Sequence, residues 1–452
     1  MTFGGVISGA GTGALTVGDS TNNGTVIFSG TNTYTGGTAV GPGTLSVSFN
    51  SNLGNTSGSL DLSGGNLTFT GSSAQTISRI INVLSSSTIT NSNSGTSPSL
   101  TLSSTITGPA SATAATLTFA GANNITVSAT IQDGSGAALA VNQTGSNTTT
   151  LTGANTYTGG TSVTSGVLSV GADSNLGDAA GVINLNGGNL TITGSSAYST
   201  SRSVNVLASS TITNNNTTAS TPVIFSGTVT GPISVTAANL TLTGTYDITL
   251  SGVVQDGSGS TLAITKSGTS TGLLSNTNTY SGGTTISAGI LKAGSATAFG
   301  ASSGAISVSN GATLDLNGQT LANTNPLSLK GTGVSSAGAL TNSSSTEATY
   351  AGLLSLTGDA TLKASVGNIV LSNTGTITGA TYTLTLDGVT GTTSSIASII
   401  GTTTGGVTKN GAGTWILSGA NTYTGTTSIA VGALRATHNS ALGATSGVVT
   451  VT

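Results

Sequence analysis

The amino-acid sequence predicts an all-β protein that coils into a β-solenoid, and three observations support this prediction. First, short alternating strands follow one another along all 452 residues, with no change of texture that would mark a domain boundary. Second, a long internal duplication keeps its register, as stacked repeats require. Third, only 4% of the residues are charged. Ladders of like charge would repel at the roughly 4.8 Å spacing of stacked strands.

The strands are recognised by their alternation. Residues 25–29, 59–63, 66–70 and 116–120 alternate apolar with small polar side chains at a period of two, as strands with one buried face do. Gly or Asn-Gly follows within a few residues, and no stretch has a sustained helical pattern. This spacing fits a sandwich, a barrel or a solenoid, and the three observations favour the solenoid. With about 20–25 residues per turn, the chain would make an elongated rod of roughly 18–22 turns, roughly 90–105 Å long.

Composition excludes several classes of protein. A mean hydropathy of +0.25 and a net charge of −3 argue against disorder. The chain has no cysteine, so it has no disulfide and no zinc–thiolate site. Its eight Lys and Arg residues are scattered singly, which argues against a nucleic-acid partner, and we expect them to be solvated or snorkelling. No apolar run approaches the ~18–20 residues of a membrane helix, so we expect no membrane span in this chain.

The repeat is organised around the motif Asn-Thr-Tyr-x-Gly-x-Thr. Its tyrosines are separated by 157 − 34 = 123, 280 − 157 = 123 and 423 − 280 = 143 residues. The chain is therefore interpreted as one continuous solenoid over residues 1–452, with internal units of about 29–151, 152–274 and 275–452. The third unit diverges after Gly300 and regains the pattern at Lys409. The structural motif residues are Asn32, Tyr34, Gly36, Asn155, Tyr157, Gly159, Asn278, Tyr280, Gly282, Asn421, Tyr423 and Gly425.

The motif has an expected physical role. Asn155 and Tyr157 should point to one side of a strand, and Gly159-Gly160 should let the backbone turn with positive φ. Tyr157 should close the core at a corner, with its hydroxyl hydrogen-bonded. A row of ligand-stacking tyrosines is the functional alternative. It is disfavoured because copies roughly 5–6 turns apart cannot form one site.

At these residues the chain resembles the autotransporter-associated β-strand repeat of bacterial surface proteins. The family pattern is matched most closely by Lys409, Gly411, Gly413, Thr414, Leu417, Gly419, Asn421, Tyr423, Gly425, Thr427, Gly432 and Leu434. The resemblance implies a right-handed parallel β-helix of the passenger type, located outside the cell or on the bacterial surface. It names no ligand and no cofactor.

The ends of the sequence lie inside repeats. Met1-Thr2-Phe3 begins without a charged segment or a long apolar stretch, so we expect either that a secretion signal lies outside this sequence or that another export route is used. We also expect either a fragment of a longer protein or a subunit whose open ends pair. The inter-subunit edge would then be Val448, Val449, Thr450, Val451 and Thr452.

No constellation of residues predicts catalysis, a cofactor or a metal. His438 is the only histidine. The closest acids, Asp173 and Asp178, are interpreted as a turn, because the matching residues one unit earlier are asparagines. Asp133-Gly134 and Asp256-Gly257 lack the tandem spacing of a calcium repeat and are also interpreted as turns.

These observations favour a non-enzymatic extracellular rod with a structural or adhesive function. A sharper form of the hypothesis is a head-to-tail surface filament, in which the partner is a second copy or another surface component. The alternative is a polysaccharide-active enzyme or lectin on a β-helix, which would need clustered acids and exposed aromatic residues. Ice or crystal binding through flat threonine arrays is a third, weaker hypothesis.

Overall fold

The computed structural model describes residues 1–18, 23–95, 99–218 and 222–452, and the chain divides into two compact units, Met1–Thr221 and Pro222–Thr452. Across the described residues, parallel strands stack into a β-solenoid of about 19 turns without an α-helix. The prediction of an all-β solenoid is therefore confirmed. No helix in the described part of the chain is both long enough and apolar enough to cross a membrane. The internal units inferred from the repeat remain a prediction.

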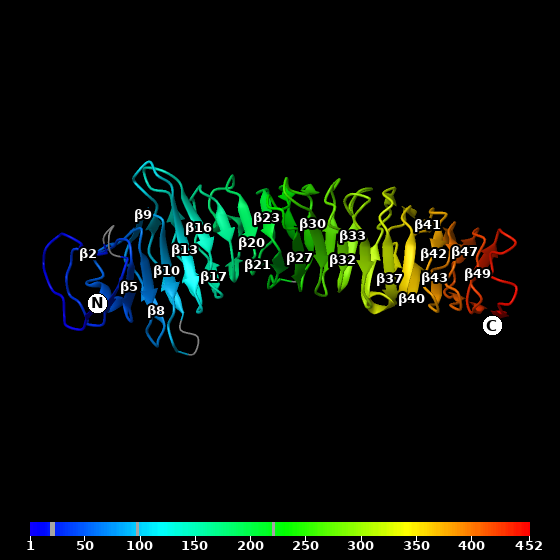
Figure 1. The fold of residues 1–452 in the computed structure, drawn as a ribbon, viewed down its shortest axis with the longest axis horizontal. Coiled ribbons are helices and arrows are strands. Elements are labelled where there is room, and N and C mark those ends of the chain that lie inside the picture. Colours follow the sequence, from blue (N-terminus) through cyan, green and yellow to red (C-terminus); the bar gives the residue numbers. More distant parts are fainter. Residues whose placement is uncertain (19–22, 96–98, 219–221) are drawn as a thin grey trace. The chain divides into compact units, whose positions relative to one another are not determined.

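The N-terminal unit has three sides, visited in the chain order I, II, III. Figure 1 shows its strands in blue to green. Side I contains β8 (Gln75–Ile77), β11 (Leu100–Leu102), β14 (Ile125–Val127), β17 (Thr148–Leu151), β19 (Val167–Val170), β21 (Asn189–Ile192) and β24 (Ser210–Asn214). Side II contains β2 (Leu15–Val17), β4 (Thr38–Val40), β6 (Leu60–Ser63), β9 (Ile81–Ser85), β12 (Ile106–Thr107), β15 (Ile131–Gln132) and, further along, β22 (Tyr198–Thr200). Side III contains β1 (Thr2–Phe3), β3 (Thr25–Phe28), β5 (Thr44–Val47), β7 (Asn66–Phe69), β10 (Ser87–Asn91), β13 (Ala115–Gly121), β16 (Leu139–Gln143), β18 (Thr161–Val163), β20 (Ile183–Asn186) and β23 (Val204–Ala208). Two short 3₁₀ helices, η1 (Asn50–Leu53) and η2 (Asp173–Leu176), follow β5 and β19.

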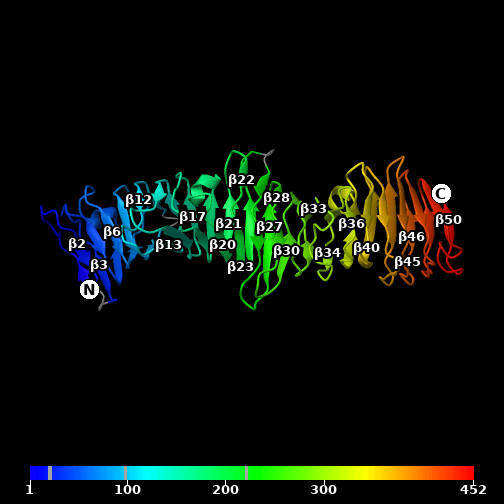
Figure 2. The ribbon, with the colours of Figure 1, turned by 90° about the horizontal axis from the view of Figure 1, so that it is seen from above.

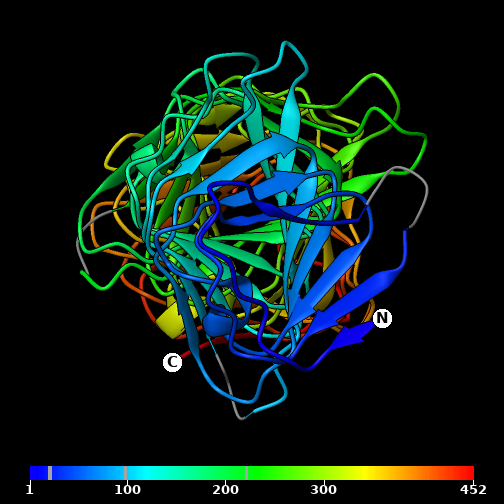
Figure 3. The same ribbon diagram turned by 90° about the vertical axis from the view of Figure 1, so that its left-hand side faces the viewer.

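Alternation fills the interior of this unit with stacked apolar side chains. Leu45, Leu67, Ile89 and Phe119 are register partners on side III, and each is fully buried. In Figure 3 the blue and cyan strands of this unit are arranged around this common interior. Each fully buried side chain of this size stabilises the fold by about 1.5–3 kcal/mol. Stacking therefore supplies the core that a single turn could not.

The outward face of side I carries at least one hydroxyl side chain on every strand. The register partners, in order, are Thr76, Thr101, Thr126, Thr150, Ser169, Thr191 and Thr213. A neutral hydroxyl can stack on its own kind without the repulsion of a charge column. The low content of charged residues thus follows from stacking like side chains on the outer surface.

The C-terminal unit also has three sides, named IV to VI. Side IV contains β27 (Ala238–Gly244), β30 (Leu262–Lys266), β32 (Thr284–Ile286), β34 (Ile306–Val308), β37 (Leu327–Gly331), the first part of β40 (Leu354–Ala364), β42 (Thr376–Ile377) and β45 (Ile399–Ile400). Side V contains β25 (Val223–Phe225), β28 (Ile248–Leu250), β31 (Thr271–Leu274), β33 (Gly289–Ala293), β35 (Ala312–Asp315), β38 (Leu340–Thr341), the second part of β40, β43 (Leu384–Gly388), β46 (Val407–Lys409), β48 (Thr427–Ile429) and β50 (Val449–Val451). Side VI contains β26 (Val229–Thr230), β29 (Val254–Gln255), β36 (Thr320–Leu321), β39 (Ala348–Tyr350), β41 (Ile369–Leu371), β44 (Thr393–Ile396), β47 (Thr414–Leu417) and β49 (Ala433–Ala436), and η3 (Val334–Ser336) is a short 3₁₀ helix. Figure 2 shows these strands in green to red.

The motif moves from one side to the next between copies. In the N-terminal unit, Tyr34 lies on side I beneath η1 and β8, whereas Thr156 pairs with Ile131 of side II. Counting along side I gives five whole turns and one further side for 123 residues, or about 23 residues per turn. In the C-terminal unit, Thr279 pairs with β29 of side VI and Thr422 with β45 of side IV, which is six turns and one side later.

Candidate functional site

The motif asparagine joins three consecutive turns through its side chain. Asn155 Oδ1 accepts a hydrogen bond from Ile131 N of the preceding turn at 2.8 Å. Its Nδ2 donates to the carbonyl oxygen of Asn175 in the following turn at 2.5 Å. Asn155 is only 5% exposed. The same pair of bonds is made by Asn32, Asn278 and Asn421. The four copies therefore share this pair of asparagine hydrogen bonds, which we call the inter-turn clamp.

The motif tyrosine fills the corner behind the clamp. A hydrogen bond of 2.7 Å joins Tyr157 Oη to Thr161 Oγ1, and Tyr34, Tyr280 and Tyr423 make the same bond to the threonine four residues later. Tyr157 and Tyr280 are fully buried. Burial raises the pKa of Tyr157 well above its usual range, because the phenolate would lose its hydration. The tyrosine is therefore a neutral core residue, and its ring is not available to stack on a ligand.

The two motif glycines serve different purposes. Gly160 has φ of +79°, which glycine adopts without strain. Gly159 is required by a close approach, because a Cβ there would lie 2.6 Å from the carbonyl oxygen of Leu139. The sequence interpretation assigned positive φ to both glycines, and this was wrong for the first of the pair. In the fourth copy Thr426 replaces the second glycine, and its φ is not positive.

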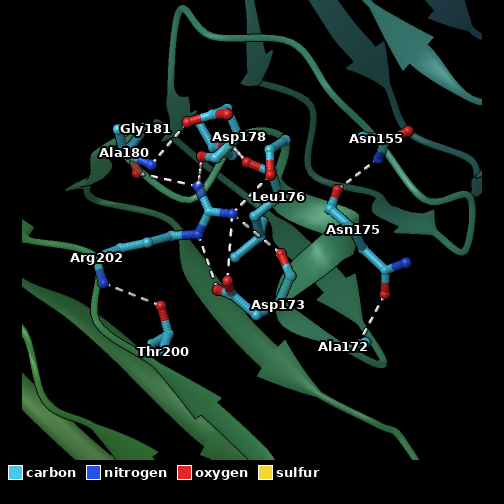
Figure 4. A network of polar contacts seen from close by, with 12 residues as sticks. Asn155, Ala172, Asp173, Asn175, Leu176, Asp178, Ala180, Gly181, Thr200 and Arg202 are labelled. Atoms are coloured by element: carbon cyan, nitrogen blue, oxygen red, sulfur yellow. Dashed lines mark hydrogen bonds and ion pairs between the residues drawn. The ribbon is translucent and has the colours of Figure 1, made fainter.

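A buried guanidinium lies above the loop that follows the second copy (Figure 4). Arg202 Nε donates to Asp173 Oδ1 at 2.8 Å, and this forms an ion pair. Its Nη atoms donate to the main-chain carbonyls of Asp173, Gly177, Asp178 and Gly181. Arg202 is 2% exposed. The carboxylate of Asp178 instead accepts from Ala180 N at 2.9 Å in a local turn.

The same position one unit earlier lacks the carboxylate. Arg79 is 1% exposed and donates to four main-chain carbonyls and to Asn50 Oδ1 at 3.2 Å. Its Nε has no partner among the described residues, and it forms no ion pair there. Burial lowers the pKa of Arg79, with the nearby Tyr34 acting in the opposite direction. One unit later Asn325 takes this position and donates to the carbonyls of Ala301 and Gly304.

Two lysines lie at the inner corner preceding the motif. Lys266 and Lys409 are fully buried. Lys409 Nζ donates to the carbonyls of Asn410, Gly411 and Val431, at 2.8, 2.6 and 3.0 Å. Burial lowers the pKa of Lys266 to about 8, opposed by the charge of Asp247, and burial also lowers the pKa of Lys409.

The expectation that the isolated cations are solvated was therefore wrong for Arg79, Arg202, Lys266 and Lys409. Main-chain carbonyl groups replace the water that these side chains would otherwise need. They come from the preceding turn for the two arginines and mainly from the adjoining residues for the two lysines. In the N-terminal unit Gln143 occupies the lysine position and donates to the Asn147 side chain at 2.9 Å.

Two aspartates outside the motif accept hydrogen bonds that link the motif to a strand that precedes it in the chain. Asp133 Oδ1 accepts from Leu139 N at 2.7 Å, and its Oδ2 accepts from Thr158 Oγ1 at 2.7 Å. Asp256 makes the same contacts with Leu262 and Ser281. Both carboxylates are thus engaged by protein donors, as turn residues. The described residues contain no group of three or more His, Asp or Glu that could hold a metal.

The C-terminal edge is exposed. Val448, Val449 and Val451 are 60%, 46% and 75% exposed. β50 pairs with β48, with Thr450 opposite Ser428, and Thr452 N donates to the Ile429 carbonyl at 3.2 Å. Among the described strands, the pairing registers give β50 one partner, β48.

Comparison with known proteins identifies the repeat. The family model described as the passenger-associated-transport-repeat matches residues 20–47, 141–170, 264–293 and 407–436. The chain is also 37% identical over 180 residues to the adhesin BmaC autotransporter of Brucella suis biovar 1, a match that covers 37% of this chain and 4% of that protein. No solved structure matches the chain. The inter-turn clamp lies in the matched segments, and the chain carries four passenger-associated-transport repeats.

Proposed function

We propose that this chain is an adhesive, non-enzymatic section of a passenger-type protein that acts on the bacterial surface or outside the cell. One observation carries the proposal: the repeated polar residues are consumed by hydrogen bonds and ion pairs within the chain, both between turns and within one turn. The clamp asparagines, the motif tyrosines and the buried cations all bind their own chain. The motif therefore builds a scaffold, and its outer surface of hydroxyl side chains remains for contacts. The adhesin relative supports the same function.

Adhesion is tested with the purified chain coupled to beads. After washing, we expect these beads to retain more host-cell or bacterial surface material than beads coupled to an unrelated soluble protein. A matched bead carries the chain with Tyr157→Ala, which opens the core at one corner. If the wild-type beads retain no more material than the unrelated control, the adhesive function is refuted.

A second proposal is head-to-tail assembly, which the exposed edge of β50 supports. Unpaired strand edges template pairing with another chain. Electron microscopy over a concentration series should then show filaments for the wild type, and Val449→Lys with Val451→Lys should abolish them, because charge on an edge opposes pairing. Single particles at every concentration would exclude assembly by this chain alone.

A further inference from the structure

An open cleft that carries exposed polar side chains lies on side IV of the C-terminal unit, where the repeat is broken. It has a volume of about 460 Å³, within the range of roughly 300–1,000 Å³ typical of ligand sites. Its lining residues are Asn310, Lys330, Gly331, Thr332, Gly358 and Asp359. They come from the ends of β34, β37 and the first part of β40, three strands that pair in succession. All of them lie in the segment after Gly300 in which the third unit departs from the duplicated pattern.

An irregularity in the ladder creates the cleft. The register between β37 and β40 shifts between Leu329 and Gly331, and this bulge separates the two strands locally. Gly331 has φ of +89°, and a Cβ there would lie 2.3 Å from Asn310 Oδ1. A Cβ on Gly358 would lie 3.0 Å from the Cβ of Lys330. Two missing side chains therefore keep the cleft open.

The polar groups in the cleft are largely unused by the protein. Within the described chain, neither Lys330 nor the side chain of Asn310 has a hydrogen-bond or ion-pair partner. Asp359 Oδ1 accepts from Thr383 N at 2.8 Å, which leaves Oδ2 available in the described structure. By contrast, Lys292 and Lys363 of the same unit are paired with aspartates at 3.3 Å.

The chemistry of these groups defines the ligand. An ammonium donates hydrogen bonds, a carboxylate accepts them, and a carboxamide does both. Hydroxyl groups also do both, so a chain of hydroxyl groups can satisfy all three. The opposite charges of Lys330 and Asp359 cancel, which favours a neutral ligand over an acidic one. A column of outward hydroxyls, Ser307, Ser328 and Ser355, runs along the same three strands and extends the polar surface.

We propose that this cleft binds a neutral oligosaccharide, and that Lys330, Asp359 and Asn310 form hydrogen bonds with its hydroxyl groups. This proposal rests on the adhesive function above and names the class of its ligand. No aromatic side chain lines the cleft, so the stacking that tightens many sugar sites is missing and binding is weak. Contact strength then comes from many chains at one surface.

The test is saturation-transfer NMR with the full chain and four probes: cellohexaose, maltohexaose, chitohexaose and hexagalacturonate. We expect at least one neutral probe to bind. Lys330→Ala and Asp359→Asn should each raise its dissociation constant about tenfold, since each removes one hydrogen bond to a charged group. Asp359→Asn keeps the oxygen that accepts from Thr383, so the fold is preserved. The matched control is Glu347→Gln, which changes an exposed acid outside the cleft.

Two results would overturn the proposal. One is the absence of binding by every neutral probe, including the case in which hexagalacturonate alone binds. The other is binding that neither Lys330→Ala nor Asp359→Asn weakens. The bead assay separates this failure from a failure of the proposed function, because beads that still retain surfaces would refute the cleft alone.

Discussion

The two buried arginines offer an experiment in which each copy of the repeat is the control for the other. Arg202 has a carboxylate at Asp173, whereas Arg79 has the amide of Asn50. Asp173→Asn should convert the second site into the first, and Asn50→Asp should do the reverse. The carbonyl cradle stays in place in both variants, so only the ion pair changes.

The magnitude follows from the contacts. The bond from Arg202 Nε to Asp173 Oδ1 is charge-assisted, and such bonds contribute about 1.5–3 kcal/mol. Truncating one partner of a buried pair costs about 3–5 kcal/mol. The side chain of Asp173 is 27% exposed and the substituted amide retains an acceptor, so we expect Asp173→Asn to lower the free energy of unfolding by about 2 kcal/mol. Asn50→Asp should raise it by about 1 kcal/mol, because desolvating the new carboxylate offsets part of the gain.

The assay combines urea unfolding with amide hydrogen exchange of residues 50–55 and 173–178, because a stack of turns can open locally. Asp178→Asn is the matched control. Its side chain binds only its own turn, and Arg202 reaches this residue through the main-chain carbonyl. Changes below about 0.5 kcal/mol for Asp173→Asn, or a loss of stability in Asn50→Asp, would refute the assigned role of the ion pair.

Three further predictions concern the clamp and the inner corner. Asn155→Ala should cost about 2–4 kcal/mol, measured by urea unfolding against Asn310→Ala as control, because a buried donor and a buried acceptor lose their partners. Gly159→Ala should destabilise the same turn more than an alanine at an open position without positive φ such as Gly5, since its Cβ would clash with a main-chain carbonyl; equal melting temperatures would contradict this. The pKa of Lys266 is lowered in the folded chain, so between about pH 8 and the ordinary lysine pKa the unfolded chain binds more protons than the folded chain. The free energy of unfolding should therefore rise with pH from 7.5 to 9.5, by at most about 3 kcal/mol. Lys266→Gln, which installs the side chain of the other unit, should flatten that rise, and an unchanged slope would exclude Lys266 as its source.

The sequence was sufficient for the strands, the stacking and the repeat, because all three depend on local pattern. Alternation at period two indicates which face of a strand is buried. The 123-residue spacing of the motif can be read from the sequence without knowing the geometry of the turns. The burial of Arg79 and Lys409 could not be predicted in this way. Their partners are main-chain carbonyl groups, and main-chain groups leave no trace in side-chain identity. The cleft at Lys330 was equally hidden, although the loss of the repeat after Gly300 marked its segment.

The extra third of a turn explains why the motif can recur without building one continuous face. The clamp contacts only the turns immediately before and after it, through main-chain groups such as Ile131 N and the Asn175 carbonyl. Every side of a solenoid turn presents such groups at the same strand spacing. A duplicated segment therefore needs matching neighbours, and it does not need to return to the same side. Because Tyr34 and Tyr157 lie on different sides of one unit, what the copies share is their inter-turn bonding and not a common face. The cleft that we propose as a binding site lies instead where the repeat is interrupted, around Lys330.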